Sequence, residues 1–226
     1  MRGSLESIIK HMIKLNNHKS NISFPAIVVN TDNLADGFID VKPLVNNMNS
    51  VTGDTIEYPP IRNVQVLMPS TKSSSIVFPI KQGDTVDLLF QSVDILSFVN
   101  GEKEAHDPFG NGWGNLSNVV AIVGFTPYQQ SAFNPNNYTN DFNNQYLNIV
   151  HNKNTNNESI ISINTDGDIT LKSPTKVVVE SKVVEVVADK LTTQGDIEIQ
   201  GKSVNEFMLK HTHIGNQGSP TSPPNI

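Results

Sequence analysis

Short hydrophobic runs separated by turn residues fill residues 21–126. Val, Ile and Phe dominate these runs, which lie at 23–30, 37–44, 62–68, 75–80, 85–90 and 119–125. The turns place glycine beside aspartate or asparagine, at Asp36-Gly37, Gly53-Asp54, Gly83-Asp84 and Asn100-Gly101. Apolar runs separated by such turn residues are typical of β-strands joined by tight connections. Five or six strands within about 100 residues fit a small barrel better than a two-sheet sandwich, so we predict an OB-fold domain over 21–126.

A helical spacing replaces this pattern in residues 1–20. The apolar stripe of an amphipathic helix is formed by Leu5, Ile8, Ile9, Met12 and Ile13. Ser4 precedes the stripe and serves as an N-cap. A helix of about three turns is not stable alone in water. The stripe therefore docks either on its own domain or on an assembly partner.

Residues 127–157 are rich in asparagine and poor in charge. Eleven of the 28 asparagines of the chain lie here, with only Asp141 and Lys153 as charged residues. Four aromatic residues recur along the segment, namely Phe133, Tyr138, Phe142 and Tyr146. A disordered linker usually has fewer aromatic residues. We therefore predict a linker or extended cover in which some of the rings pack against a surface.

Residues 158–210 carry β-branched residues in alternating or continuous runs, without an intervening helical pattern. A weak repeat relates Gly167-Asp-Ile-Thr-Leu to Gly195-Asp-Ile-Glu-Ile, 28 residues later. Strands of this kind cannot bury their apolar faces within about 50 residues of one chain. We predict several intertwined copies that share a β-prism or β-helix, which also removes exposed strand edges. A second β-domain that folds alone remains the alternative.

The sharpest chemical signal lies in residues 211–226. His211 and His213 are two positions apart, so in an extended strand both imidazoles point to the same side. Three chains meeting on an axis would supply six nitrogens, which suits an octahedral ion such as iron better than structural zinc. Residues 214–226 contain no charged side chain, and three prolines stiffen them. An isolated pair of histidines is more often a surface feature, but this setting favours a metal-binding apex.

Composition excludes several classes of protein. Charged residues make up 17% of the chain, against about 25% in typical domains. The absence of cysteine removes disulfides and thiolate chemistry. The net charge of −6 argues against a nucleic-acid partner, which needs a basic face. No apolar run is long enough for a membrane-spanning helix, and charged residues interrupt the N-terminal segment, so we expect no secretion signal.

The sequence gives only weak support for a catalytic function. An acidic loop holds Glu102, Glu104, His106 and Asp107 within six residues. Paired carboxylates serve glycoside hydrolysis, but spacing within a loop favours solvated side chains, and no nucleophile-elbow, phosphate-loop or zinc-protease motif occurs. Asp166-Gly167-Asp168 resembles a fragment of a calcium loop, yet without further ligands at loop spacing it predicts a turn. We therefore predict no enzymatic activity and no catalytic residues.

Three segments together resemble a known family. They are Phe24-Pro-Ala-Ile-Val-Val-Asn with Phe38-Ile-Asp-Val-Lys-Pro-Leu; Tyr58-Pro-Pro-Ile-Arg-Asn-Val-Gln-Val with Phe78-Pro-Ile-Lys-Gln-Gly-Asp-Thr-Val, His106-Asp and Leu116-Ser-Asn-Val-Val-Ala-Ile; and His211-Thr-His213. In this order the chain resembles the central spike, or membrane-piercing tip, proteins of contractile-tailed bacteriophages, of the phage P2 gpV and phage phi92 Gp138 type. The asparagine-rich residues 127–157 match no motif of that family.

The resemblance implies an all-β homotrimer with three OB domains as a collar. A triple-stranded β-helix over 158–210 follows, and His211 and His213 of three chains hold one octahedral iron ion per trimer at the apex. The collar would dock on the baseplate hub at the end of the tail tube. Sheath contraction would then drive the spike through the host outer membrane. The protein would be a virion component at the baseplate tip, made in the host cytoplasm.

Two related assemblies remain alternatives. A trimeric receptor-binding tail fibre also combines trimeric β-structure with asparagine-rich loops, and a glycan-degrading tailspike would use the paired carboxylates of the acidic loop. A receptor-binding tip needs aromatic or charged contacts, and residues 214–226 offer neither. The sequence therefore favours the piercing spike.

Overall fold

The computed structural model describes residues 6, 9, 22–49, 52–105, 107, 115–140 and 142–210. The chain forms two compact units, residues 1–175 and 176–226. Within the predicted N-terminal helix only Glu6 and Ile9 are described, and both are helical. The remainder of that prediction, and the whole predicted apex at 211–226, lie outside the described residues.

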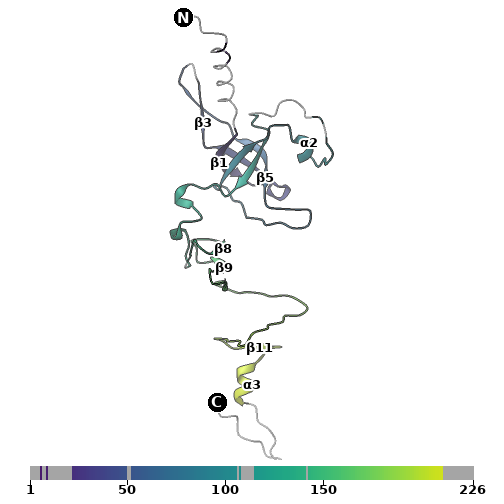
Figure 1. The fold of residues 1–226 in the computed structure, drawn as a ribbon, viewed down its shortest axis with the longest axis vertical. Helices are drawn as coiled ribbons and strands as arrows, with labels where there is room; N and C mark the ends of the chain where they lie inside the picture. The colour runs from purple at the N-terminus through teal and green to yellow at the C-terminus, as the bar shows by residue number, and fades with distance from the viewer. Residues whose placement is uncertain are drawn as a thin grey trace, which may run out of the picture. The chain divides into compact units, whose positions relative to one another are not determined.

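A closed barrel of five strands forms the first part of unit 1 (Figure 1). Its strands are β1 (Ser23–Asn30), β2 (Phe38–Pro43), β5 (Ile61–Leu67), β6 (Thr85–Phe90) and β7 (Val119–Val123). Their order around the barrel is β1-β2-β5-β7-β6, and β6 pairs with β1 to close it. Only the β5–β7 pair of the barrel is parallel. The predicted small barrel is confirmed, with an OB-like arrangement of strands.

The barrel interior is built by alternate residues of each strand. In β1, Phe24, Ala26 and Val28 are buried while their neighbours are only partly so. Val86 and Leu88 of β6 repeat this period of two and are fully buried. One face of each strand thus turns inward, as the pleat of a strand requires. The resulting core lies within residues 24–121.

Two parts of the barrel domain differ from the prediction. Residues 75–80 form no strand beyond an isolated bridge between Ser70 and Ser75. Pro79 lacks the N–H that a ladder needs, and of this run only Ile80 reaches the core. An unpredicted exposed hairpin joins β3 (Asn46–Met48) to β4 (Thr55–Glu57). Its polar residues give no alternating hydrophobic signal.

Short helical turns precede a second sheet in unit 1. The turns are η1 (Leu34–Asp36) and α2 (Leu96–Val99) within the barrel domain, and η2 (Tyr128–Gln130) and η3 (Pro135–Asn137) after it. The sheet consists of β8 (Leu147–His151), β9 (Ser159–Ile163) and β10 (Ile169–Lys172), all antiparallel in the order β10-β9-β8. β8 lies inside the segment 127–157 that the sequence assigns to a linker, so the sheet begins earlier than the predicted boundary.

The repeat motif at 167 forms the turn between β9 and β10. The side-chain oxygen of Asn164 accepts hydrogen bonds from the backbone N–H groups of Asp166 and Asp168, at 2.9 and 2.8 Å. The Asn164 amide donates to the Asp168 carboxylate at 2.9 Å. Gly167 takes a positive φ of 89°, a conformation that glycine adopts without steric cost. The Asp166-Gly167-Asp168 motif is therefore a turn, as predicted.

Unit 2 contains little regular structure within its described residues. Residues 173–197 form neither helix nor strand. A hairpin of β11 (Glu198–Ile199) and β12 (Lys202–Ser203) leads into α3 (Val204–Lys210). The Ser203 hydroxyl oxygen accepts a hydrogen bond from the backbone N–H of Glu206 at 2.9 Å. This is one half of a capping box, and it places a helix where the sequence analysis predicted continuous β-structure.

Candidate functional site

The predicted metal ligands, His211 and His213, lie outside the described residues. In the part of the chain that the structure does describe, no group of three or more His, Cys, Asp or Glu side chains could hold a metal ion. The acidic loop after α2 places Glu102, Glu104 and Asp107 at the surface, and His106 is not described. None of the described helices is long and apolar enough to cross a membrane.

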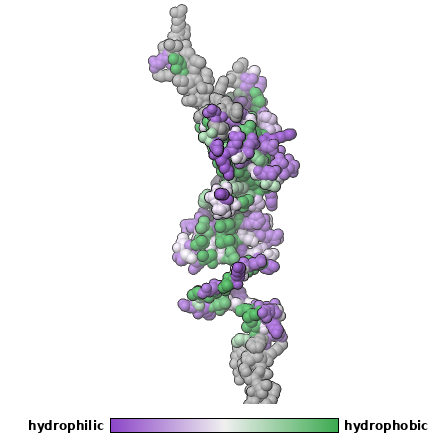
Figure 2. All heavy atoms as spheres, turned by 90° about the vertical axis from the view of Figure 1, so that its right-hand side faces the viewer, coloured by the Kyte–Doolittle hydropathy of each residue, from purple (hydrophilic) through white to green (hydrophobic). Residues whose placement is uncertain are grey.

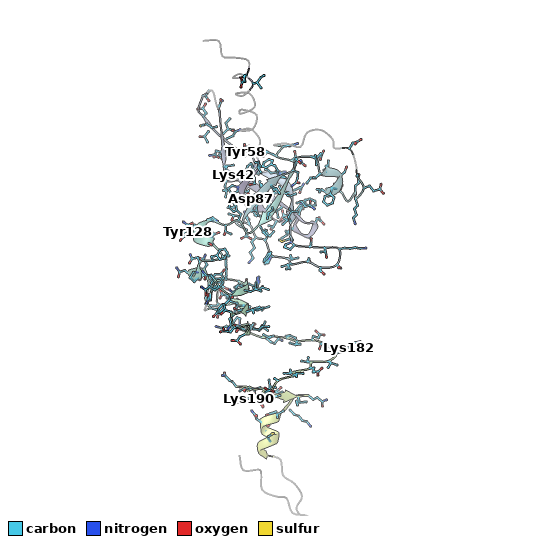
Figure 3. All side chains as sticks on the ribbon, viewed as in Figure 1. Lys42, Tyr58, Asp87, Tyr128, Lys182 and Lys190 are labelled. Atoms are coloured by element: carbon cyan, nitrogen blue, oxygen red, sulfur yellow. The ribbon has the colours of Figure 1, made fainter. Side chains whose placement is uncertain are left out.

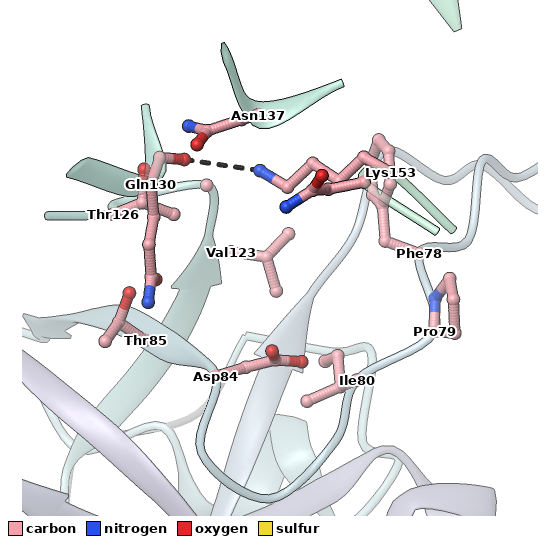
Figure 4. Close-up of a pocket in the computed structure, with 12 residues that line it drawn as sticks. Phe78, Pro79, Ile80, Asp84, Thr85, Val123, Thr126, Gln130, Asn137 and Lys153 are labelled. Carbon is pink, nitrogen blue, oxygen red and sulfur yellow. Dashed lines mark hydrogen bonds between the residues drawn. The ribbon is translucent and has the colours of Figure 1, made fainter. Parts of the chain in front are cut away.

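A cavity of about 640 Å³ lies between the barrel and the segment that follows it (Figure 4). Phe78, Ile80 and Val123 give it an apolar wall. On the opposite side the Lys153 ammonium donates a hydrogen bond to the Gln130 carbonyl at 3.2 Å. These contacts connect the barrel domain to the asparagine-rich segment.

Several polar side chains of this cavity have structural partners. The Asp84 carboxylate accepts a hydrogen bond from the Lys81 backbone N–H at 2.7 Å. The Thr85 hydroxyl donates to the Phe125 carbonyl at 2.7 Å. Among the described residues that line the cavity there is no histidine, serine or cysteine, so this part of the lining holds no Ser–His or Cys–His pair of a hydrolytic site.

A single buried carboxylate organises the asparagine-rich segment. Glu158 is only 2% exposed. Its oxygens accept hydrogen bonds from the backbone N–H groups of Thr139, Asn140 and Asn154, at 2.9, 2.8 and 2.8 Å, and from the Asn140 amide at 2.9 Å. Burial alone would raise the pKa of this carboxyl, but the four hydrogen bonds outweigh burial and lower its pKa below the usual value.

Two of the predicted packing rings stack on each other. Tyr138 and Phe142 lie with ring centroids 3.8 Å apart and planes within 6°. The Tyr138 hydroxyl donates to the Ala132 carbonyl at 2.7 Å. Burial, together with the nearby negative charge of Glu158, raises the pKa of Tyr138. Phe133, in contrast, is exposed. The described part of the segment is thus ordered, with Tyr138, Phe142 and Tyr146 partly buried.

One face of the β8–β10 sheet is a grid of six aliphatic side chains. Cross-strand pairing places Leu147, Ile163 and Ile169 in one row, and Ile149, Ile161 and Leu171 in the next. Directly opposite residues of paired strands share a face, so all six point the same way. Five of them are between 41% and 71% exposed, and Ile163 is partly buried. We call this set the neck face; Figure 2 shows hydrophobic surface over this part of unit 1.

The opposite face of the same sheet is partly covered by its own chain. Ile160 points to that face and is buried. The Asn148 amide beside it donates hydrogen bonds to the carbonyls of Asn143 and Tyr146, at 2.8 and 3.0 Å. The chain therefore closes one side of β8 and β9 and, within the described residues, leaves the neck face open. Isolated monomers rarely expose contiguous apolar patches of this kind.

A second apolar surface runs along residues 176–191, which we call the valine segment. Its exposed large side chains are Val177, Val178, Val179, Val183, Val184, Val186, Val187 and Leu191, from 51% exposed at Val177 to 89% at Val187. Figure 3 draws the side chains of this segment, with Lys182 and Lys190 labelled. Its backbone has no ladder partner in the described chain. Unpaired β-branched chain is a template for pairing with other strands.

The sequence analysis assigned residues 158–210, which include β9, β10 and the valine segment, to shared β-structure, but it recognised neither β8 nor the role of Glu158. Leu147 and Ile149 alternate with polar residues, yet the surrounding asparagines hide this signal within a predicted linker. Glu158 is the only acidic residue between Asp141 and Asp166. A single carboxylate in a segment so poor in charge was the sequence signal that could have indicated a structural role. Both features follow from contacts between residues that are far apart in sequence.

Residues 24–124 match the family model described as the phage protein Gp138 N-terminal domain. The match runs from β1 to the residue after β7 and so covers the five barrel strands almost completely. No curated protein matches the chain significantly. The matched segments include the barrel segments on which the predicted resemblance rested. Residues 24–124, just under half of the chain, are therefore similar to the N-terminal domain of the phage protein Gp138, which indicates a phage structural protein.

Proposed function

We propose that this protein is the central spike of a contractile phage tail, which pierces the host outer membrane when the sheath contracts. The observation that carries the proposal is the valine segment, whose backbone has no strand partner in the described chain. If three copies wind around one another, the unpaired backbone N–H and C=O groups of this segment gain hydrogen bonds and its exposed valine side chains become buried. A β-helix of three chains is the expected product, and the valine segment that would form it lies C-terminal to the phage Gp138-type domain, after the β8–β10 sheet.

The barrel is the collar in this proposal. It connects the spike to the baseplate hub at the end of the tail tube, and the virion is the expected location of the protein. The spike itself acts mechanically and needs no catalytic site. A narrow apex without charged side chains suits this role, because residues 214–226 carry no charge to desolvate on entering lipid.

Iron is the expected ion at the apex. His211 and His213 supply two imidazoles per chain, and three chains supply the six nitrogens that an octahedral transition metal accepts. The bound metal would hold three chain ends together, because metal binding to the assembled state stabilises that state. The support for an iron ion at the apex is the pair of imidazole side chains that the sequence supplies, His211 and His213.

Native mass spectrometry of the full chain tests the proposal in one spectrum. A mass of three 24.8 kDa chains plus one transition-metal ion is the expected result. His211→Ala should abolish the metal while the trimer remains. His151→Ala, at an exposed histidine of β8, is the matched control and should keep both. A metal-free monomer would overturn the spike, and a trimer without metal would overturn the iron apex alone.

A further inference from the structure

Resting on the proposed trimer, we propose that the neck face is a separate assembly surface, on which three copies pack their sheets side chain to side chain around a common axis. β8, β9 and β10 are already hydrogen-bonded to one another within a single chain. Each copy therefore supplies one finished wall of a three-walled prism. This differs from the valine segment, where copies must pair backbone to backbone.

The chemistry of the neck face identifies its occupant as a second and third copy of the same chain. All six side chains are aliphatic, and no charged residue lies in either row. Such a surface offers nothing to recognise a charged or polar partner, but it complements an identical surface well. In a closed cyclic assembly the same side chains of every subunit can converge on the symmetry axis.

Chain continuity supports the same occupant. β10 ends at Lys172, only three residues before the valine segment begins. If the valine segments of three copies intertwine, their neck faces are held together at high effective concentration. On the opposite side of the sheet Ile160 is buried, and the Asn148 amide donates hydrogen bonds to the carbonyls of Asn143 and Tyr146 in the segment before β8. The neck face is thus the side of the sheet that remains for packing.

This arrangement assigns an assembly role to Glu158. Its hydrogen bonds tie Thr139 and Asn140 to Asn154, in the connection between β8 and β9. They hold the segment before β8 close to the start of β9, and in the proposed arrangement the aliphatic grid faces the axis. Glu158 acts here as a positioning residue, since it contacts no other copy in the proposed arrangement. The neck then sets three chains in register before the valine segments wind together.

Thiol protection in the full-length protein tests the proposal, because the native chain has no cysteine. Leu171→Cys and Thr170→Cys place single thiols on adjacent residues of β10 that face opposite sides of the sheet. Both positions are exposed in the single chain. In the assembled protein we expect Leu171→Cys to react with a polar maleimide at least about tenfold more slowly than Thr170→Cys, because only accessible thiols react readily. Rates in denaturant normalise the intrinsic reactivity of each thiol.

A nitroxide attached to the same two cysteines identifies what covers the face. Sheets that pack face to face lie about 10 Å apart, so labels at Leu171→Cys should broaden one another's spectra strongly, and labels at Thr170→Cys should not. Assembly with excess unlabelled chain should remove the broadening. Ile149→Cys on β8 is a second variant, in case a label at Leu171→Cys prevents folding.

The outcomes separate this proposal from the function on which it rests. A trimer in native mass spectrometry with equal thiol reactivity at Leu171→Cys and Thr170→Cys would overturn the neck assembly and leave the spike standing. A trimer with a protected thiol but no spin broadening would mean that the chain's own residues cover the face, which also overturns it. A monomer would overturn both.

Discussion

Ile161 of β9 lies directly opposite Leu171 of β10, and both side chains project from the open face of the sheet, 41% and 54% exposed. Ile160, the neighbour of Ile161, points the other way and is buried against the same chain. One strand thus has a side that its own chain covers and a side that remains open. This contrast between adjacent residues is the strongest physical sign that the described chain is part of a larger assembly.

Ile161→Asp is expected to destabilise the assembled protein. The substitution places an unpaired carboxylate on the neck face of every copy, and burial of such a charge is costly. We expect the thermal midpoint of the full chain, measured by circular dichroism, to fall by about 5 °C or more. Thr170→Asp adds the same charge to the exposed opposite face and should shift the midpoint by about 1 °C or less. Equal thermal midpoints in the two variants would mean that the neck face stays exposed to solvent in the assembled protein.

Glu158→Gln is expected to destabilise unit 1. Glutamine keeps the shape of the side chain but loses the negative charge that three backbone N–H groups share. Loss of charge-assisted bonds to a buried group costs about 1–3 kcal/mol, measurable by urea unfolding. Glu57→Gln removes an exposed carboxylate that lies 3.0 Å from the Lys42 ammonium, and such pairs contribute at most about 1 kcal/mol. A smaller effect at Glu158 than at Glu57 would contradict the assigned role.

The same carboxylate predicts a pH dependence with a definite sign. The folded structure lowers the pKa of Glu158, so the folded state binds its proton less tightly than the unfolded chain does. Its contribution is fully present above the unfolded pKa of about 4.3 and is lost as pH falls through the lower folded pKa. The difference in unfolding free energy between wild type and Glu158→Gln should therefore shrink below about pH 4. If this difference in unfolding free energy grew as the pH fell, the folded structure would not lower the pKa of Glu158.

The barrel was predictable because its strands alternate cleanly. In β1, buried Phe24, Ala26 and Val28 stand at every second position, which is the period that a half-buried strand imposes. The run at 75–80 has similar composition, yet Pro79 breaks the ladder and only Ile80 reaches the core. Composition identified the apolar residues there but could not tell whether their backbone finds a partner.

The neck was less predictable because its determinants are non-local. Leu147 and Ile149 become part of a face only when β9 and β10 pair beside them. The helix α3 had a local signal, since Ser203 and Glu206 have the spacing of a capping box. That signal was overlooked because the surrounding β-branched residues favoured strands. The predicted ligands His211 and His213 remain a prediction.

Asn118 is expected to be essential for the connection between β6 and α2. It is 5% exposed, and its amide donates hydrogen bonds to the carbonyls of Gln91 and Val93, at 3.0 and 2.7 Å. Its side-chain oxygen accepts from the Ile95 backbone N–H at 3.2 Å. Asn118→Ala leaves these groups without their partner and should lower the unfolding free energy by about 2–4 kcal/mol. Asn47→Ala, in the exposed β3–β4 hairpin, is the control and should cost under about 1 kcal/mol.

Removal of the proposed metal should weaken the assembled apex without unfolding the barrel. A strong chelator at neutral pH is expected to lower the thermal midpoint of the wild-type trimer, because a ligand bound only to the assembled state stabilises it by mass action. Imidazole binds a metal only in its neutral form, so acidification through the histidine range near pH 6 should release the ion as well.

Variants of the apex histidines give the control for this experiment. In a His211→Ala/His213→Ala variant the chelator should change nothing, and the midpoint should already equal that of the chelated wild type. His151→Ala should respond to the chelator as the wild type does, since this histidine lies on β8 and outside the proposed donor set. A wild-type midpoint that ignores both chelator and acid would show that the three chain ends are held by strand pairing alone. Strand pairing in the valine segment and hydrophobic contacts of the neck face would then hold the three copies together without a metal.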